Sequence, residues 1–259
     1  MIQKQLVAHN FSRSSTEYES VALCQSYAAG RFAGMIADLI VDKESTTRIL
    51  EVGCGTGFLT KTLIGLFPHA EITVYDISEQ MLKICKENTE TVRKQHGSRV
   101  NFVKHDIAMD KIYGEYDLVV SGLALQWLEL ELPKVITKIR EHLAVNGAFM
   151  FSTLTADTFK RLKDSFQECN VDFPGPMLFE RDKLSELVGD STISFEVYKD
   201  YYPTVLAFLD QLKSTGAVNA TGKPVPLTKL RQIIRDYTEK CSSNEVIAEY
   251  HLAYCVMTG

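Results

Sequence analysis

The stretch that decides the fold is I-L-E-V-G-C-G-T-G at residues 49–57. Its apolar beginning predicts a buried strand, which ends in three glycines at alternate positions, Gly53, Gly55 and Gly57. Glycine lets the backbone turn sharply and bring its N–H groups close to a ligand. Loops that bind dinucleotides normally space their glycines as G-x-G-x-x-G, so this G-x-G-x-G spacing disfavours a nicotinamide dehydrogenase.

Strands and helices alternate regularly around this loop, which predicts an α/β fold with a doubly wound, mostly parallel sheet. The expected strands of the core are residues 48–53, 71–75, 100–104, 116–121 and 148–153. Helices are expected over residues 20–41, 59–67, 79–94 and 130–143. After residue 154 the pattern changes, with helices expected over 156–169, 204–214 and 227–240 and strands over 193–202 and 246–257.

Acidic or small polar residues stand at the ends of four successive predicted strands: Glu51, Asp76, Asp106 and Ser121. In an open α/β sheet, ligands bind at the carboxyl ends of the strands. A carboxylate there can accept hydrogen bonds from a ribose diol or an adenine amino group. Any one of these residues is more often a turn or a helix cap, but four at one edge favour a binding site.

The glycine loop, with an acidic residue two places before its first glycine, resembles motif I of the class I S-adenosylmethionine (SAM) methyltransferases. The resemblance implies a Rossmann-like, seven-stranded fold with a helical substrate cover, and SAM as cofactor. Glu51 would face the ammonium group of the cofactor or its water shell, Asp76 the ribose and Asp106 the adenine amino group, with isoleucines packing on the ring. The residues expected to bind the cofactor are Glu51, Gly53, Gly55, Gly57, Asp76, Ile77, Asp106, Ile107, Ser121 and Leu123.

Further stretches resemble the malonyl-[acyl-carrier protein] O-methyltransferases of bacterial biotin synthesis. They are F-S-R-S-S-T-E-Y at 11–18, L-A-L-Q-W at 123–127, F-S-T-L at 151–154, L-K-S-T-G-A at 212–217 and Y-H at 250–251. One departure is Ser14-Ser15, where alanines are more usual in the family. The resemblance implies that the chain methylates the free carboxylate of a malonyl thioester on acyl-carrier protein, giving a methyl ester.

A carboxylate acceptor requires little acid–base chemistry from the protein. Aliphatic carboxyls titrate near about pH 4, so the nucleophile is already ionised and no general base is needed. We expect an apolar pocket that sheds water, and no metal site, because the six histidines are scattered. The candidate acceptor residues are Tyr18, Trp127, Arg181 as a guide for the carboxylate, and His251, with Phe151, Phe173, Phe179 and Tyr250 as further candidate walls. For Arg181 the alternative is a solvated or salt-bridged arginine near a helix start, and for His251 it is a core histidine with its hydrogen bonds satisfied.

The charge balance indicates which partners to expect. With 28 Lys and Arg against 33 Asp and Glu the net charge is −5, which disfavours general nucleic-acid binding. No apolar run approaches about 18 residues and no signal peptide is evident, so we expect a cytoplasmic protein with reduced cysteines. Between residues 211 and 235 there are five basic residues and no acidic one, a stretch that would steer acidic acyl-carrier protein unless it is only a solvated helix face: Lys213, Lys223, Lys229, Arg231 and Arg235.

We expect one methyltransferase domain over residues 1–259. Within it, residues 1–20 are expected to form a lid, 48–154 the SAM-binding core, 155–240 a substrate cover and 241–259 a closing strand. Two alternatives stay open: a SAM methyltransferase of a small free acid or other metabolite, and a non-catalytic SAM-binding protein.

Overall fold

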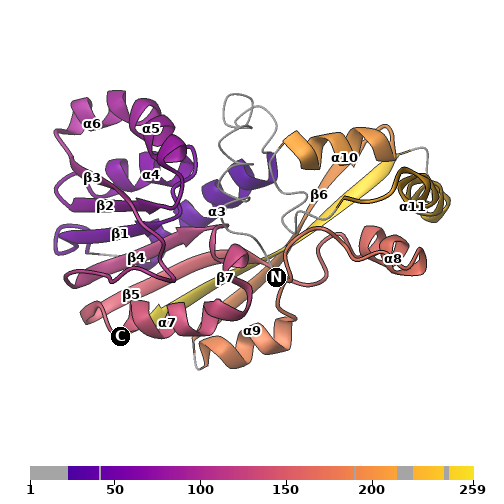
Figure 1. The fold of residues 1–259 in the computed structure, drawn as a ribbon. Helices are drawn as coiled ribbons and strands as arrows, with labels where there is room; N and C mark the ends of the chain where they lie inside the picture. Colours follow the sequence, from indigo (N-terminus) through magenta and orange to yellow (C-terminus); the bar gives the residue numbers. More distant parts are fainter. Residues whose placement is uncertain (1–22, 41, 190, 215–223, 242–244) are drawn as a thin grey trace.

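The computed structural model describes residues 23–40, 42–189, 191–214, 224–241 and 245–259 (Figure 1). The predicted lid at residues 1–20, with Tyr18, lies outside the described residues, and so does Lys223. Within the described ranges, no helix is both long and apolar enough to cross a membrane.

A seven-stranded sheet with strand order β3-β2-β1-β4-β5-β7-β6 forms the centre of the molecule (Figure 1). Strands β1 to β5 pair in parallel, and β7 runs antiparallel to both β5 and β6. This topology confirms the prediction of a doubly wound, mostly parallel Rossmann-like sheet. The strands are β1 (Arg48–Val52), β2 (Glu71–Asp76), β3 (Arg99–Lys104), β4 (Tyr116–Gly122), β5 (Leu143–Leu154), β6 (Thr192–Tyr202) and β7 (Val246–Thr258).

Helices cover both faces of the sheet, and each face has its own hydrophobic core. Along β1, Ile49 packs into one core while Leu50 and Val52 pack into the other, as expected of a strand buried on both faces. The helices of the first face are α3 (Leu23–Leu39), α4 (Phe58–Leu66), α5 (Glu79–Asn88), α6 (Glu90–His96), α8 (Lys160–Glu168), α10 (Val205–Ser214) and α11 (Leu227–Lys240). On the second face lie η1 (Leu125–Glu131), α7 (Leu132–Arg140) and α9 (Arg181–Val188).

β6 and β7 extend beyond the carboxyl end of β5. The pairing of β5 with β7 stops at Leu154 and Leu252, whereas β6 and β7 remain paired as far as Tyr202 and Val246. Helices α8, α10 and α11 pack on this two-stranded extension (Figure 1). The segment 155–240, expected to be a cover, therefore also supplies the edge strand of the sheet.

Two local expectations differ from the structure. The single helix expected over residues 79–94 is two helices that meet at Thr89, whose backbone (φ −96°, ψ −2°) departs from the regular helical conformation. Helix α9 was not among the helices assigned from the sequence, although one alternative for Arg181 placed it near a helix start.

Candidate functional site

A cavity of about 180 Å³ lies at the carboxyl ends of β1, β2 and β4. Of the residues expected to bind the cofactor, all but Gly57 and Ser121 line it. It therefore lies at the edge of the sheet where ligands of open α/β folds bind. Its walls also include residues that the sequence did not single out, among them Gln25 and Ala29 of α3, Met81 of α5, and Tyr75, His105 and Leu128.

The three loop glycines have left-handed backbone conformations for different reasons. A Cβ on Gly53 (φ 76°) would lie 2.3 Å from Cβ of Ala124, and one on Gly57 (φ 95°) 2.9 Å from Sγ of Cys85. A Cβ on Gly55 (φ 53°) would meet no protein atom within 4 Å. Gly53 and Gly57 thus permit close packing within the protein, whereas Gly55 leaves space open beside the cavity.

Two carboxyl groups, those of Glu51 and Asp76, face the cavity from the ends of β1 and β2. Glu51 is 1% exposed and its Oε2 accepts from the hydroxyl of Thr60 at 2.6 Å. Burial raises the pKa of Glu51 to about 7. Asp76 accepts from the N–H groups of Gly55 at 3.1 Å and Ser78 at 2.8 Å, yet burial still raises its pKa to about 6. A cation bound nearby would favour the ionised form of both groups.

The turn that follows β3 brings two further predicted residues, Asp106 and Ile107, to the cavity. Oδ1 of Asp106 accepts from the N–H of Ala108 at 3.0 Å, so part of its hydrogen-bonding capacity serves the turn itself. The residues just before the two aspartates, Tyr75 and His105, stack with their ring centroids 3.9 Å apart. These two rings were not singled out from the sequence, although each directly precedes one of the predicted aspartates, Asp76 and Asp106.

The segment after β4 closes another side of the cavity. Leu123 has a left-handed conformation (φ 47°), and its carbonyl accepts from the side-chain amide of Gln126 at 2.6 Å. This tight turn directs the chain into η1, from which Trp127 lines the cavity. Ser121 lies behind the wall, fully buried, and its hydroxyl donates to the carbonyl of Val52 at 2.8 Å. This hydrogen bond therefore links β4 to β1, and the hydroxyl of Ser121 does not face the cavity.

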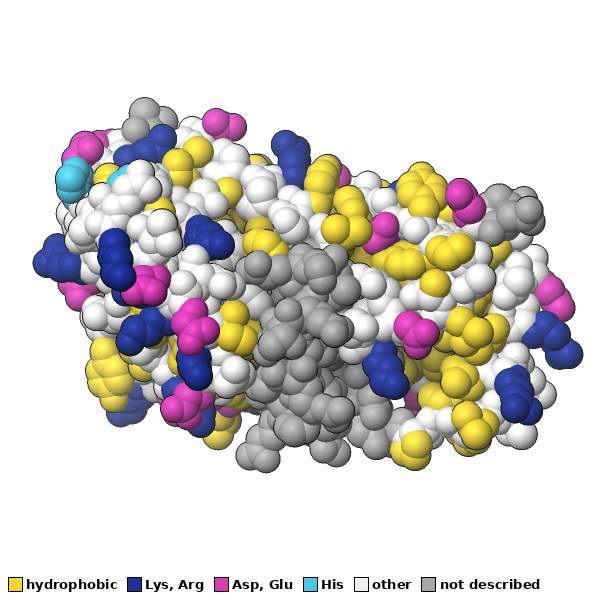
Figure 2. Space-filling view, turned by 90° about the horizontal axis from the view of Figure 1, so that it is seen from above, with side chains coloured by type: hydrophobic (Ala, Val, Ile, Leu, Met, Phe, Trp, Pro, Cys, Tyr) yellow, Lys and Arg dark blue, Asp and Glu magenta, His cyan; other side chains and the backbone are white. Residues whose placement is uncertain are grey.

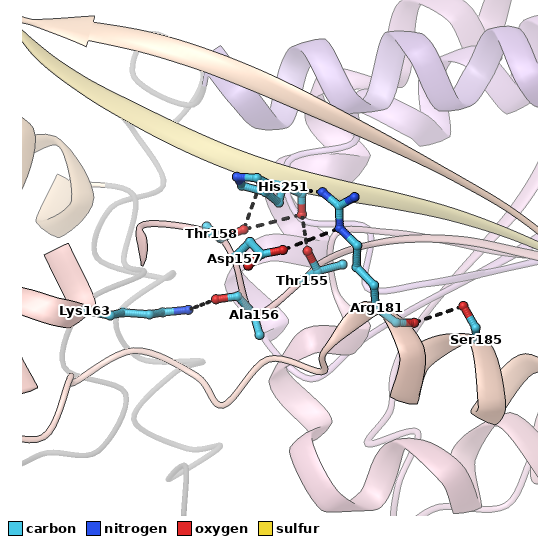
Figure 3. A network of polar contacts seen from close by, with 8 residues as sticks. All are labelled: Thr155, Ala156, Asp157, Thr158, Lys163, Arg181, Ser185 and His251. Atoms are coloured by element: carbon cyan, nitrogen blue, oxygen red, sulfur yellow. Dashed lines mark hydrogen bonds and ion pairs between the residues drawn. The ribbon is translucent and has the colours of Figure 1, made fainter. Parts of the chain in front are cut away.

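Arg181 and His251 lie together in a polar network beyond the end of β5 (Figure 3). Nη2 of Arg181 lies 3.0 Å from Nδ1 of His251, and its Nε 3.5 Å from Oδ2 of Asp157. The guanidinium also lies over the ring of Phe195, 5.0 Å from its centroid. Burial, together with the charge of Arg181, lowers the pKa of His251, although Asp157 opposes this shift. The imidazole is therefore held in its neutral form and can accept from Arg181.

These two candidate acceptor residues are thus near neighbours, but neither lines the cavity. Two of the candidate walls are corrected by the structure. Phe151 is completely buried in the core of the second face, and Tyr250 is 6% exposed and packs edge-on against Phe159 in the other core. Phe173, which packs edge-on against Phe166, and Phe179 are both only partly buried.

The described residues contain no group of three His, Cys, Asp or Glu side chains that is arranged to hold a metal ion. All six cysteines are free thiols. Cys54 of the glycine loop is buried, and a contact with Cys85 together with burial raises its pKa well above the ordinary value. A thiol kept protonated in this way is a poor nucleophile, which favours a packing role.

Comparison with known proteins agrees with this geometry. A family model described as a methyltransferase domain matches residues 50–149. The YcgJ protein of Bacillus subtilis shares the fold at a TM-score of 0.56 and 11% identity, over 89% of this chain and 99% of that one. A magnesium protoporphyrin IX methyltransferase of Synechocystis with bound S-adenosylhomocysteine (SAH) gives a TM-score of 0.52 at 16% identity, over 88% of this chain and 82% of that one.

Similarity in sequence extends over nearly the whole chain. The malonyl-[acyl-carrier protein] O-methyltransferase of Bacillus anthracis is 29% identical, over 100% of this chain and 98% of that protein. The corresponding protein of Bacillus cytotoxicus is 30% identical, over 98% of this chain and 91% of that protein. Whole-length similarity to these enzymes, on a fold with its cavity at the end of β1, shows that the chain belongs to the malonyl-[acyl-carrier protein] O-methyltransferase family.

Proposed function

We propose that this chain transfers a methyl group from SAM to the free carboxylate of a malonyl thioester on acyl-carrier protein, in the cytoplasm, giving the methyl ester used in biotin synthesis. The observation that carries the proposal is the cavity at the carboxyl ends of β1, β2 and β4, where the glycine loop and three acidic residues converge. The names of the whole-length relatives support the choice of acceptor.

The lining residues fit the cofactor. Gly55 leaves open space, Glu51 and Asp76 carry carboxyl groups that a cation would ionise, and Ile77 and Ile107 supply apolar surface beside Asp106. Bound SAM would supply an electrophilic methyl group on a cationic sulfonium. The roles expected from the sequence, ammonium to Glu51, ribose to Asp76 and adenine to Asp106, are part of this proposal.

The protein's contribution to the reaction is orientation and exclusion of water. The acceptor is a carboxylate, so no side chain has to remove a proton. Trp127, Leu125 and Leu128 of η1 give the cavity an apolar wall. A water-poor wall strengthens the attraction between a carboxylate and a sulfonium, and fixed positions hold the reacting atoms in line.

We place the acceptor end of the site beside Arg181 and His251, with Tyr18 contributing from outside the described residues. The side chain of Arg181 is 40% exposed, so an incoming carboxylate can reach it. It already shares its charge with Asp157 and its N–H groups with His251. A guanidinium with these partners would guide the malonyl group without pairing with it so tightly that the carboxylate loses nucleophilicity.

The basic stretch is proposed to attract acyl-carrier protein. Lys213, Arg231 and Arg235 are exposed, whereas Lys229 is partly buried and donates to the carbonyl of Cys169 at 3.0 Å. Seen from above, the part of the molecule that carries α10 and α11 shows many hydrophobic side chains, with single basic and single acidic ones between them (Figure 2). We expect a diffuse field that speeds the encounter with an acidic partner.

The exposed cations give a direct test of this field. Replacing Arg231 and Arg235 by Glu should raise KM for malonyl-acyl-carrier protein at low salt and leave SAM affinity unchanged. Because Lys229 has a structural contact, it is left intact in this test. An unchanged KM at low salt would reject the basic stretch as a docking element.

The proposed reaction is tested by mass spectrometry of malonyl-acyl-carrier protein after incubation with the chain and SAM. One added methyl group per carrier is expected, and saponification should remove it because it is an ester. Malonyl-CoA and free malonate serve as competing acceptors, and equal use of free malonate would favour a methyltransferase of small acids. If label from methyl-tritiated SAM appears in none of these acceptors although SAM binds, a non-catalytic SAM-binding protein is the better reading.

A further inference from the structure

Lys138 of α7 makes three hydrogen bonds to one short turn. Its Nζ donates to the carbonyls of Ile107 at 2.8 Å, Ala108 at 3.2 Å and Asp110 at 3.0 Å. An ammonium group has three N–H donors, so each donor has a backbone acceptor. Hydrogen bonds from a charged donor are stronger than those between neutral groups. Lys138 therefore acts as a clamp on residues 107–110.

The clamped turn is the one that presents Asp106 and Ile107 to the cavity. Two contacts within the turn link Asp106 to the residues that Lys138 holds. The backbone N–H of Asp106 donates to Oδ2 of Asp110 at 2.8 Å, and Oδ1 of Asp106 accepts from the N–H of Ala108 at 3.0 Å. Ala108 and Asp110, which make these two contacts with Asp106, are thus also residues whose carbonyls Lys138 holds. The direction of the Asp106 carboxylate depends on the shape of this turn.

Lys138 itself is not among the residues that line the cavity. Removing its ammonium would leave three backbone carbonyls without their charged donor in a partly buried place, a loss that destabilises the local arrangement. The effect would pass to the cavity through the turn alone, since the element that carries Lys138 lies behind it.

We propose that Lys138 is a positioning residue for the adenine end of the cofactor: it fixes the turn at residues 106–110 so that the Asp106 carboxylate meets the 6-amino group of adenine. This inference rests on the proposed binding of SAM. Lys138 touches neither cofactor nor acceptor in this arrangement, and its influence is confined to cofactor affinity and to discrimination at position 6 of the purine.

The test compares SAH with S-inosylhomocysteine, which has a carbonyl oxygen in place of the 6-amino group and carries a proton on the adjacent N1. Dissociation constants are measured by calorimetry for the full chain and for Lys138→Met. The unaltered chain should prefer SAH by about tenfold or more, as expected for a lost charge-assisted hydrogen bond. In Lys138→Met we expect affinity for SAH to fall about tenfold and affinity for the inosyl analogue to change less than about twofold, so that the preference disappears.

Three further measurements complete the design. Lys134→Met removes an exposed lysine from the same helix and should change neither constant. Lys138→Arg keeps a cation with several N–H donors and should recover most of the preference. In turnover assays Lys138→Met should raise KM for SAM while kcat at saturating SAM stays within about twofold. If Lys138→Met does not fold, Lys138→Gln takes its place, with a partial loss of preference expected because one donor group remains.

The outcomes separate this inference from the proposed function. If the unaltered chain binds neither SAM nor SAH, the proposed function itself is wrong. If it binds SAH but does not discriminate against the inosyl analogue, or if Lys138→Met weakens both ligands equally, Lys138 does not position an adenine contact and the inference is overturned.

Discussion

Replacement of single glycines tests whether the loop after β1 is shaped by a ligand or by packing alone. A Cβ on Gly55 would meet no protein atom within 4 Å, whereas one on Gly53 would lie 2.3 Å from Cβ of Ala124. Both residues have positive φ, which costs an L-residue roughly 1–2 kcal/mol. Gly55→Ala should therefore lower the free energy of unfolding by about 1–2 kcal/mol, through backbone strain alone. In Gly53→Ala a steric cost of about 1–3 kcal/mol is added, for a total of about 2–5 kcal/mol.

Gly55→Ala should lose less stability than Gly53→Ala but much of its affinity for SAH. The new methyl group of Gly55→Ala would take up space beside the cavity, so we expect affinity for SAH to fall well over tenfold although the protein remains folded. Gly97→Ala is the matched control, because Gly97 has a similar φ of 61°, its Cβ would also meet nothing within 4 Å, and it does not line the cavity. This control should lose similar stability and keep its affinity for SAH.

Urea denaturation measures the first quantity and titration calorimetry with SAH the second. The reasoning fails if Gly55→Ala binds SAH as tightly as Gly97→Ala does, because the open space beside Gly55 would then not be ligand space. It also fails if Gly55→Ala loses as much stability as Gly53→Ala, because its Cβ would then have met protein atoms.

Four further outcomes follow from the polar groups near the cavity. The pKa of Glu51 is raised to about 7 and that of Asp76 to about 6, so binding of the cationic SAM near neutral pH should release protons, seen as a dependence of the calorimetric heat on the ionisation heat of the buffer. Without ligand, folded Glu51 keeps a proton that the unfolded chain loses near pH 4.5, so its contribution to the free energy of unfolding should decrease as pH rises from about 4.5 to about 7, as a urea series at several pH values would measure. Thr60→Val removes the donor 2.6 Å from Oε2 of Glu51 and should raise that pKa further, moving the pH at which SAM affinity is half-maximal upward. Ser78→Ala removes the cap that accepts from the N–H of Met81 at 3.2 Å and should cost about 1 kcal/mol in urea denaturation.

The sheet and most of the cavity wall could be predicted because they depend on local patterns and one topological rule. Continuous apolar runs mark the strands, and parallel strands bring their carboxyl ends to one edge. Asp76 and Asp106 lie 30 positions apart in the chain, yet Asp76 ends β2, Asp106 comes two residues after β3, and the two strands are neighbours in the sheet. The order of the predicted strands along the chain was therefore enough to predict that both aspartates lie at the same edge of the sheet as the cavity.

Other features depend on side-chain packing that no local pattern encodes. Ser121 occupies a strand end like the aspartates, but its hydroxyl is turned toward the carbonyl of Val52 and away from the cavity. The stacking of Tyr75 on His105 requires that two neighbouring strands end level with each other. The pairing of Arg181 with His251 joins residues 70 positions apart, one at the start of α9 and the other in β7.

The direction of β7 explains how His251, near the carboxyl terminus, can lie beyond the carboxyl end of β5, where we propose that the acceptor binds. Because β7 runs antiparallel to β5, its first half lies at the carboxyl end of β5: Leu252 pairs with Leu154, and the N–H of Thr155 donates to the carbonyl of His251 at 2.8 Å. A parallel β7 would have put Met257 at this edge and His251 toward the opposite one. Met257 instead pairs with Phe149, deep in the sheet and 1% exposed. Changes at Met257 should consequently affect stability, whereas changes at His251 should affect KM for the acceptor, although only six residues separate the two along the chain.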